Sequence, residues 1–506
     1  MHISLRPRLS LLGLLTVTAA LGAQPPSPWT VLQVPGGVAP ANIRQIGKVI
    51  TYVDQNQVHA YSAFTHRFVA VPTSGSPVVR VANDLALVQD GLQWHAFAAY
   101  TGQWSSVTLS SVATVLNPTT QQNDSIWLIQ DGNDLWAFTA FRGSWIRLTV
   151  PPSALVQTER HVAIVVDGTT LHGLSALHGT WVTTTAAAQP LLFRARGTAA
   201  LAATSTTAYG FSALSNAWTT APTPGPNAQI VAHDDVQVLS DQGNYLGFSG
   251  LRGTFASAAL GNVSTQLGET VCYATDGGSG HFVYSAVTGT WTTLPTTTGS
   301  VTTHVESNSV LVAASDRVHA FSAMTGTVAT ALVSPSLVQV ARSIAALTDT
   351  NGGIKFFSAI LGAWIDAPAG SASAEVSDVA GFVRTATGVS AFSSRTGRFT
   401  PLAVGPAATT TIAPGNAVQA VVEPSTFHVF DPRRERWLSA PLQSTPTIGT
   451  HRTTLMVLDG NRAWGYGSFS ARLTPIDLPT FGSIVRPNSE SGSIDVGSAI
   501  FAHSSS

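Results

Sequence analysis

Histidine recurs at one spacing along this chain of 506 residues, and its imidazole ring suits both metal binding and proton transfer. Each of these histidines stands three residues before a position, usually serine, that recurs throughout the sequence. They are His59, His95, His172, His319 and His428. Brought together in a ring, they would offer metal or ligand contacts. We favour a packing role, because each would lie on a separate repeat and be satisfied by a neighbouring backbone group.

Acidic residues recur eight residues before the same position, often with glycine following. They are Asp54, Asp90, Asp131, Asp167, Asp241 and Asp459. Aspartate followed by glycine between apolar runs predicts a tight hairpin, in which aspartate is a turn former. We find no pair of carboxylates placed for acid–base work.

The remaining reactive residue types are equally ordinary. The single cysteine, Cys272, lies in an apolar stretch and is expected to be a small buried hydrophobe, so neither a disulfide within the chain nor a cysteine-based zinc site is possible. Arg433, Arg434 and Arg436 cluster in one predicted turn and are interpreted as a solvated tip. We therefore assign no catalytic, cofactor-binding or metal-ligating residue and expect no cofactor.

Composition narrows the class of partner. Charged residues make up 10% of the chain and the formal net charge is -1. Without a basic stripe, nucleic acid is not expected as a partner. Abundant threonine, valine and serine with little lysine or glutamate favour strands.

The beginning of the chain resembles a secretory signal peptide over residues 1–23. Arg6 and Arg8 precede an apolar run, Leu9 to Val17, and small residues follow at Ala20 to Ala23. The run is too short for a good membrane anchor, and no later segment predicts a membrane span. We expect a protein that leaves the cytoplasm for the periplasm, cell surface or exterior, with residues 24–506 forming the folded part.

The elements that position all these residues are repeats with a period near 37 residues. We call the recurring position the register residue. It falls at Ser62, Ala98, Thr139, Ser175, Ser212, Ser249, Ser285, Ser322, Ser358, Ser393, Asp431 and Gly467. An aromatic residue usually precedes it, and tryptophan follows six residues later at Trp104, Trp145, Trp181, Trp218, Trp291, Trp364 and Trp437.

Each repeat predicts four short strands, which we name a to d. In the second repeat they cover Val78 to Val81, Leu85 to Gln89, His95 to Ala99 and Trp104 to Leu109. Both faces of the strands are mostly apolar or small, as sheets stacked on both sides require, so we expect the recurring aromatic residues in the interior.

The segment Phe430-Asp431-Pro432 leading to Trp437 resembles the third and fourth strands of kelch repeats. The other copies look like a drifted version with Ser-Ala in place of Asp-Pro. The resemblance implies an all-β β-propeller of about 12–13 kelch-like blades. The period is shorter than in kelch proteins, and Asp-Gly mostly replaces the expected Gly-Gly.

The two ends predict how the ring closes. Trp29 to Pro35 looks like an isolated strand d, and Gly482 to His503 looks like strands a, b and c of a last unit. Pairing them would remove exposed sheet edges. Three arrangements stay open: one large ring, two rings of six to seven blades divided near residue 265, or an open superhelix.

Two functions from different classes fit this architecture. The first is an extracellular, non-catalytic binding or scaffold protein, a monomer that contacts a protein or glycan through rim loops. The d–a loops, such as Pro72 to Pro77 and Pro222 to Asn227, are the expected contacts. The alternative is a secreted propeller enzyme, a glycan lyase or hydrolase with its site at the channel mouth. The missing catalytic clusters favour the first, although a propeller fold alone decides neither.

Overall fold

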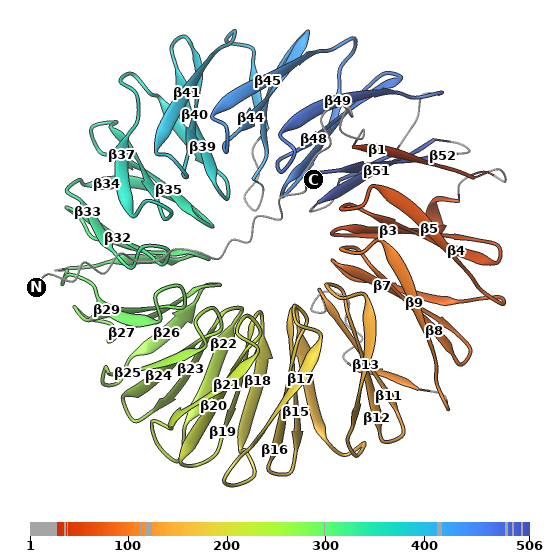
Figure 1. Ribbon diagram of the computed structural model, residues 1–506. Helices are drawn as coiled ribbons and strands as arrows, with labels where there is room; N and C mark the ends of the chain where they lie inside the picture. Colours follow the sequence, from red (N-terminus) through yellow and green to blue (C-terminus); the bar gives the residue numbers. More distant parts are fainter. Residues whose placement is uncertain are drawn as a thin grey trace, which may run out of the picture.

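The computed structural model describes residues 28–34, 37, 39–111, 113–116, 124–297, 299–411, 417–480, 484–487, 490–496 and 499–505. Within these residues the chain forms thirteen four-stranded antiparallel sheets, arranged as the blades of one ring (Figure 1). The predicted all-β propeller is confirmed. The predicted signal peptide, residues 1–23, lies outside the described residues.

Strand a opens each blade and is short, with side chains of mixed exposure. A 3-10 helix, η1 (Pro40–Asn42), precedes the first of these strands. The a strands are β2 (Ile43–Ile46), β6 (Val78–Val81), β10 (Thr114–Leu116), β14 (Leu155–Glu159), β18 (Leu192–Arg196), β22 (Gln229–His233), β26 (Ser264–Leu267), β30 (Thr302–Val305), β34 (Pro335–Ala341), β38 (Ser373–Val376), β42 (Thr409–Thr411), β46 (Thr447–His451) and β50 (Ile484–Pro487).

Strand b is buried on both faces, because neighbouring blades cover it from either side. In β15, for example, every residue except Asp167 is buried. The b strands are β3 (Val49–Asp54), β7 (Leu85–Asp90), β11 (Ile126–Asp131), β15 (Val162–Asp167), β19 (Ala199–Ala203), β23 (Val236–Asp241), β27 (Val271–Thr275), β31 (Ser309–Ala313), β35 (Ile344–Asp349), β39 (Ala380–Thr385), β43 (Gln419–Glu423), β47 (Thr454–Asp459) and β51 (Ser491–Val496).

Strand c carries the register residue at its end and is also largely buried, which confirms the interior position expected for aromatic residues such as Phe321. The c strands are β4 (Gln57–Ser62), β8 (Gln93–Ala98), β12 (Asp134–Thr139), β16 (Thr170–Ser175), β20 (Thr207–Ser212), β24 (Asn244–Ser249), β28 (His281–Ser285), β32 (Val318–Ser322), β36 (Ile354–Ser358), β40 (Gly388–Ser393), β44 (Thr426–Asp431), β48 (Arg462–Gly467) and β52 (Ala499–Ser504).

Strand d forms the other edge of each blade and alternates half-buried with exposed residues, as in β17. The d strands are β5 (Arg67–Pro72), β9 (Gln103–Thr108), β13 (Ser144–Thr149), β17 (Thr180–Thr185), β21 (Ala217–Pro222), β25 (Thr254–Ala259), β29 (Thr290–Thr293), β33 (Val328–Ala331), β37 (Ala363–Asp366), β41 (Arg398–Ala403), β45 (Arg436–Pro441), β49 (Arg472–Asp477) and β1 (Trp29–Gln33).

The register serine joins neighbouring blades. Its hydroxyl donates to the backbone carbonyl that follows the register residue of the next blade, as Ser285 Oγ does to Ala323 O at 2.9 Å. The same bond runs from Ser175 to Ala213 at 2.6 Å. These groups are fully buried, so each bond satisfies a carbonyl that water cannot reach.

The recurring tryptophan makes a second bond between blades. Trp218 Nε1 donates to Val182 O of the preceding strand d at 2.9 Å, and Trp104 Nε1 donates to Val69 O at the same distance. The expectation of a fully interior tryptophan is wrong for Trp218, which is half-buried. Strand d has no further strand beyond it, so one edge of the indole stays exposed.

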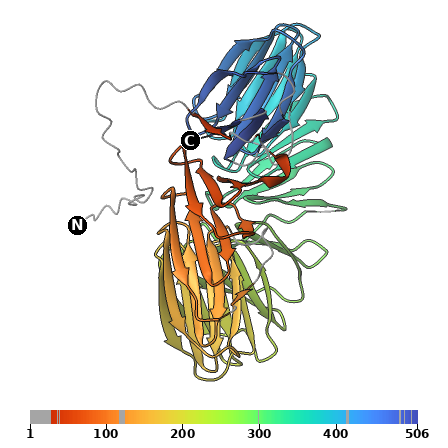
Figure 2. The same ribbon diagram turned by 90° about the vertical axis from the view of Figure 1, so that its right-hand side faces the viewer.

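The ring is closed by the first described strand. β1 pairs antiparallel with β52, with Trp29 opposite His503, and completes the sheet of β50, β51 and β52. Ser504 is the register serine of this last blade and donates to Ala63 O of the first (2.5 Å). Figures 1 and 2 show red β1 against the dark blue strands of the last blade. The predicted closure is confirmed.

The ring has no break at the position considered for two rings. Thr265 lies inside β26, a strand of the seventh blade. Ser249 Oγ bonds the sixth blade to the seventh through Ala286 O at 2.5 Å, and the seventh is bonded to the eighth in the same way.

Candidate binding site at the a–b rim

The recurring histidines do not converge. Each lies on strand c of its own blade, and four of the five face a hydroxyl directly across on strand d, as His95 Nδ1 faces Ser106 Oγ at 2.7 Å. The equivalent pairs are His172 with Thr183, His319 with Thr330, and His428 with Ser439; His59 lies opposite Ala70 instead. The predicted packing role agrees with this geometry, but the partner is a cross-strand hydroxyl and not a backbone group.

The recurring aspartates hold the d–a loops. Asp90, in a b–c turn, accepts from both the backbone N–H and the hydroxyl of Ser74 at 2.7 Å. Asp459 likewise accepts from the backbone of Gln443 and Ser444. These carboxylates therefore fix the loops that the sequence suggested as contacts.

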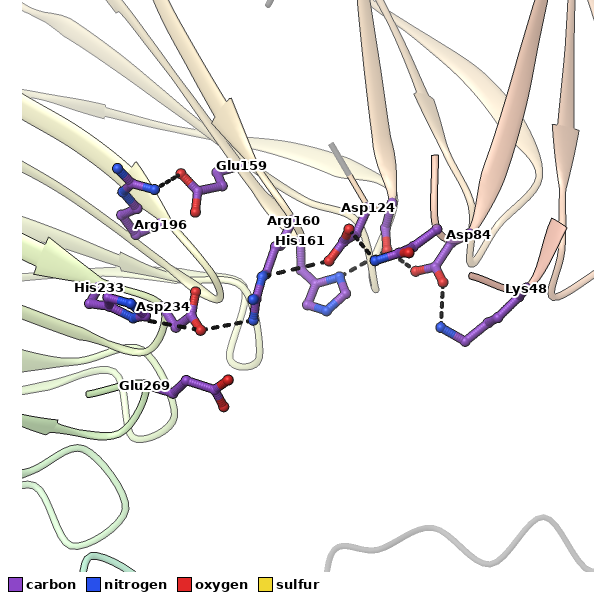
Figure 3. Close-up of polar contacts among 12 residues, drawn as sticks. Lys48, Asp84, Asp124, Glu159, Arg160, His161, Arg196, His233, Asp234 and Glu269 are labelled. Atoms are coloured by element: carbon purple, nitrogen blue, oxygen red, sulfur yellow. Dashed lines mark hydrogen bonds and ion pairs between the residues drawn. The ribbon is translucent and has the colours of Figure 1, made fainter. Parts of the chain in front are cut away.

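The opposite face of the ring, where the a–b and c–d turns lie, we call the a–b rim. Charged residues gather here at the start of the b strands. In blades one to seven they include Lys48, Asp84, Asp124, Arg160, His161, Asp234, Asp235 and Glu269, most of which Figure 3 labels. The a–b turns lie near the ring axis, because Arg342 of the ninth blade pairs with Glu269 of the seventh, across an intervening blade.

Several of these charges form ion pairs between blades (Figure 3). Lys48 Nζ lies 2.5 Å from Asp84 Oδ1 and 3.6 Å from Glu490 Oε1 of the last blade. Arg160 bridges two carboxylates, lying 2.9 Å from Asp234 and 3.6 Å from Asp124. The pairs of Lys48 and Arg160 join different blades, and the pair of Lys48 with Glu490 ties the first blade to the last.

Serine, histidine and aspartate meet in this array, but not as a nucleophilic triad. Ser125 Oγ donates to Asp84 and lies 2.9 Å from His161 Nδ1. In a triad the carboxylate orients the histidine and the serine proton points to the histidine. Here the serine hydroxyl donates its hydrogen bond to Asp84 and not to the histidine. Ser125 is also fully buried, so no substrate reaches its hydroxyl.

Burial and neighbouring charges shift the protonation of the array. Burial, reinforced by Asp84, raises the pKa of Asp124 despite Arg160. Burial lowers the pKa of His161 despite the nearby Asp84 and Asp124. Burial is the largest influence on the Lys48 ammonium and disfavours it, but Asp84, Tyr100 and Glu490 together outweigh that cost and raise its pKa. Neighbouring acids likewise raise the pKa of Arg160 against the effect of burial.

A cavity of about 390 Å³ opens on the same rim over blades nine to thirteen. Its lining combines arginines with apolar side chains and two acids. The lining residues are Arg342, Ser343, Ile360, Asp378, Val379, Arg395, Ala417, Pro432, Arg433, Arg452, Thr453, Ser468 and Glu490. The expectation of a solvated arginine tip agrees with the exposure of Arg433, Arg434 and Arg436. In addition, Arg433 borders the cavity, and Arg434 Nη1 lies 3.4 Å from Asp431.

The structure also bears on the cysteine, on metal binding and on membrane spans. Cys272 is buried as predicted, and burial raises the pKa of its thiol to about 12. Among the described residues no cluster of three or more histidine, cysteine or acidic side chains is placed to hold a metal ion. In that same part of the chain, no helix has the length and apolar character needed to cross a membrane.

Sequence reasoning missed the charges of the a–b rim. They lie two residues or fewer before strand b, but their types differ from blade to blade, so the period does not reveal them. One signal in the sequence could have revealed them. In most repeats, one of the two residues just before strand b is lysine, aspartate, arginine or glutamate.

Fold and site together define a closed β-propeller with thirteen blades in the described residues and a charged, cavity-bearing a–b rim. No family model matches the chain, and no curated protein matches it.

Solved structures resemble the chain only distantly. The computationally designed Ika8 protein is 12% identical, with 54% of this chain and 94% of that chain covered and a TM-score of 0.21. The extracellular domain of a putative one component system from B. thetaiotaomicron is 10% identical, covering 93% and 75%, with a TM-score of 0.19. PorZ, a surface component of the type-IX secretion system of Porphyromonas gingivalis, is 9% identical, covering 94% and 73%, with a TM-score of 0.21. Scores this low carry no argument about function.

Proposed function

We propose that the protein is a non-catalytic binding protein that works outside the cytoplasm and holds a partner protein on its a–b rim. The observation that carries this proposal is that recurring and non-recurring polar side chains have different positions and roles. Those that recur in the repeat serve the fold. Those that do not recur gather on the a–b rim, around a cavity. The location outside the cytoplasm rests on the signal-like residues 1–23.

Apolar side chains surround these charges on the same rim. They stand two residues after the register residue, in the c–d turns. They are Phe64, Tyr100, Phe141, Leu177, Leu214, Leu251, Val287, Met324, Ile360 and Phe469. Some stack on each other, as Tyr100 and Phe141 do with ring centroids 4.1 Å apart. Others are open, with Met324 44% and Phe469 46% exposed. Apolar groups beside unevenly placed charge suit a protein surface.

A displayed library of peptides and small domains, selected on the immobilised protein, tests this proposal. Binders should lose affinity at least about tenfold against Leu214→Asp and Met324→Asp, which place charge on the a–b rim. Leu92→Asp and Leu191→Asp are matched controls, because both leucines are exposed at the d–a and b–c loops. Binders that depend on the control positions, or a library that yields no binder while the protein binds a glycan on a parallel glycan array, would contradict the proposal.

A second candidate, a propeller hydrolase or lyase, is favoured by one observation. Burial and the neighbouring Asp84 raise the pKa of Asp124 on the a–b rim, and two carboxyl groups lying close together are a pattern of glycan-cleaving sites. Turnover of a polysaccharide by the purified protein, abolished in Asp124→Asn at unchanged stability, would establish this function in place of binding.

We also propose that the blades are kelch-like. In the copy closest to that pattern, Asp431 accepts from the backbone N–H groups of Arg433 and Arg434 and shapes the c–d turn. Asp431→Ser should then be tolerated with a small loss of stability, since serine supplies the same acceptor in other blades. A loss as large as that of Asp431→Leu would mean that the carboxylate has a different role.

A further inference from the structure

The cavity over blades nine to thirteen differs from the rest of the a–b rim in its charge. In blades ten and eleven the position two residues after the register residue is arginine, Arg395 and Arg433, where ten other blades carry an apolar or aromatic residue. Both arginines line the cavity. Within the described part of the chain neither forms an ion pair; Arg433 instead stacks on Phe469, its guanidinium carbon 4.4 Å from the ring centroid.

Two acids near the cavity have basic partners other than these two arginines. Glu269 pairs with Arg342. Glu490 lies 3.6 Å from Lys48, and Arg452 also acts on its charge. Burial, together with the neighbouring guanidinium of Arg395, lowers the pKa of Arg433. Asp431 also acts on the charge of Arg433, but among the described residues neither guanidinium group at this cavity lies in an ion pair.

We propose that Arg395 and Arg433 together bind the carboxylate of an acidic residue in a peptide segment of the partner, with an apolar neighbour of that residue held by the cavity wall. This deepens the proposed function, on which it rests. A guanidinium presents parallel N–H donors that match a carboxylate, and arginine clusters are a recurring means of recognising acidic motifs.

The remaining lining selects among anions. Ile360, Val379, Ala417 and Pro432 give the cavity an apolar wall that suits an aliphatic side chain. Asp378 and Glu490 also line the cavity, so a doubly charged phosphate or a run of sulfates would meet more repulsion than a single carboxylate. These features favour an acidic and apolar peptide over an anionic glycan.

The test uses the full chain and a fluorescein-labelled, N-acetylated peptide of alternating glutamate and leucine. Its anisotropy is measured against wild-type protein, Arg395→Leu, Arg433→Leu and Arg67→Leu. Leucine is the residue that Leu214 already provides at the equivalent position, so the first two variants should fold. Arg67 is an exposed arginine on the same rim in blade one, and its variant matches the loss of charge.

We expect saturable binding that weakens at least about tenfold in Arg395→Leu and in Arg433→Leu and is unchanged in Arg67→Leu. The matched peptide with glutamine for glutamate should not bind. Equal binding of both peptides, equal binding by all variants, or preference for inorganic phosphate or trigalacturonate over the peptide would overturn the inference. Library binders lost in Met324→Asp but retained in both arginine variants would leave the proposed function standing and remove this inference alone.

Discussion

At the residue scale, the repeat assigns the same task to the same side chain in blade after blade. Ser285 and Ser175 each satisfy a buried carbonyl of the next blade. The period shows where such residues stand. It does not show what they bond to, because the partner carbonyl belongs to another blade and the stacking of blades is a tertiary feature. The period also extends to Ser504, a thirteenth register residue beyond Gly467, the last one identified from the sequence.

Removing one of these hydroxyls should be costly. Ser249→Ala leaves the carbonyl of Ala286 buried and without this donor, for which a loss of about 1–3 kcal/mol in the free energy of unfolding is expected. Urea denaturation measures it. Ser257→Ala, an exposed serine on β25, is the control and should change stability by less than about 0.5 kcal/mol. Equal effects would mean that the hydroxyl bond contributes nothing.

His503 should make ring closure sensitive to acid. It is fully buried, and burial, followed by the charge of His66, lowers its pKa to about 3 from an ordinary value of 6.5. Between about pH 3 and pH 6.5, His503 is therefore protonated in the unfolded chain but not in the folded chain. Stability from this residue is present above pH 6.5 and is lost as the pH falls towards 3, by up to about 1.4 kcal/mol per pH unit.

Melting temperatures of wild-type protein and His503→Phe between pH 7 and pH 4 check this expectation. The variant should lose less stability over that range, because phenylalanine does not titrate. His178→Phe, which removes an exposed histidine, should follow the wild-type profile. Parallel profiles for wild type and His503→Phe would show that other groups cause the acid sensitivity.

At the scale of elements, the sequence predicts strands well because their patterns are local. Asp-Gly turns and aromatic positions place strands b and c within a residue or two. Trp29 was recognised as belonging to a strand d by its likeness to other d strands, and its indole N–H indeed donates to Thr474 O of the preceding strand d at 3.1 Å. The a–b turns carry no such local pattern, because their residues differ from blade to blade. Their charged side chains come together only when the ring closes and brings the turns near its axis.

Deleting residues 28–34 should loosen the far end of the chain. β52 would lose its hydrogen-bonded partner β1 and become an exposed edge. Hydrogen exchange measured by mass spectrometry should accelerate over Ala499–Ser504 and remain unchanged over Thr207–Ser212 of β20, in the fifth blade. Unaltered exchange in β52 would contradict closure by β1.

At the scale of the whole molecule, counting repeats predicted the number of blades but not the number of rings. Ring number depends on the angle between successive blades, which is set by inter-blade bonds that no local pattern encodes. The structure shows those bonds continuing through the seventh blade without interruption. The candidate cavity is likewise a property of the ring, because its lining comes from five successive blades.

A gene divided at Gly261, between β25 and β26, tests the single ring. Each half would expose one edge blade at either end, so each half expressed alone should aggregate, while the co-expressed halves should associate into a soluble complex. Size-exclusion chromatography with light scattering distinguishes these outcomes. Two monomeric halves that each melt cooperatively would be incompatible with one continuous ring.

Closure through β1 and β52 also imposes a delay on folding during synthesis. The strand that completes the last sheet is made first, and its partner β52 begins at Ala499, more than 460 residues after β1 ends at Gln33. At the usual rate of synthesis, roughly 5–20 residues per second, β1 waits about half a minute to a minute and a half for that partner. During that interval its polar edge is open to any other strand. A cell that makes this protein therefore has to keep β1 unpaired until β52 has been synthesised.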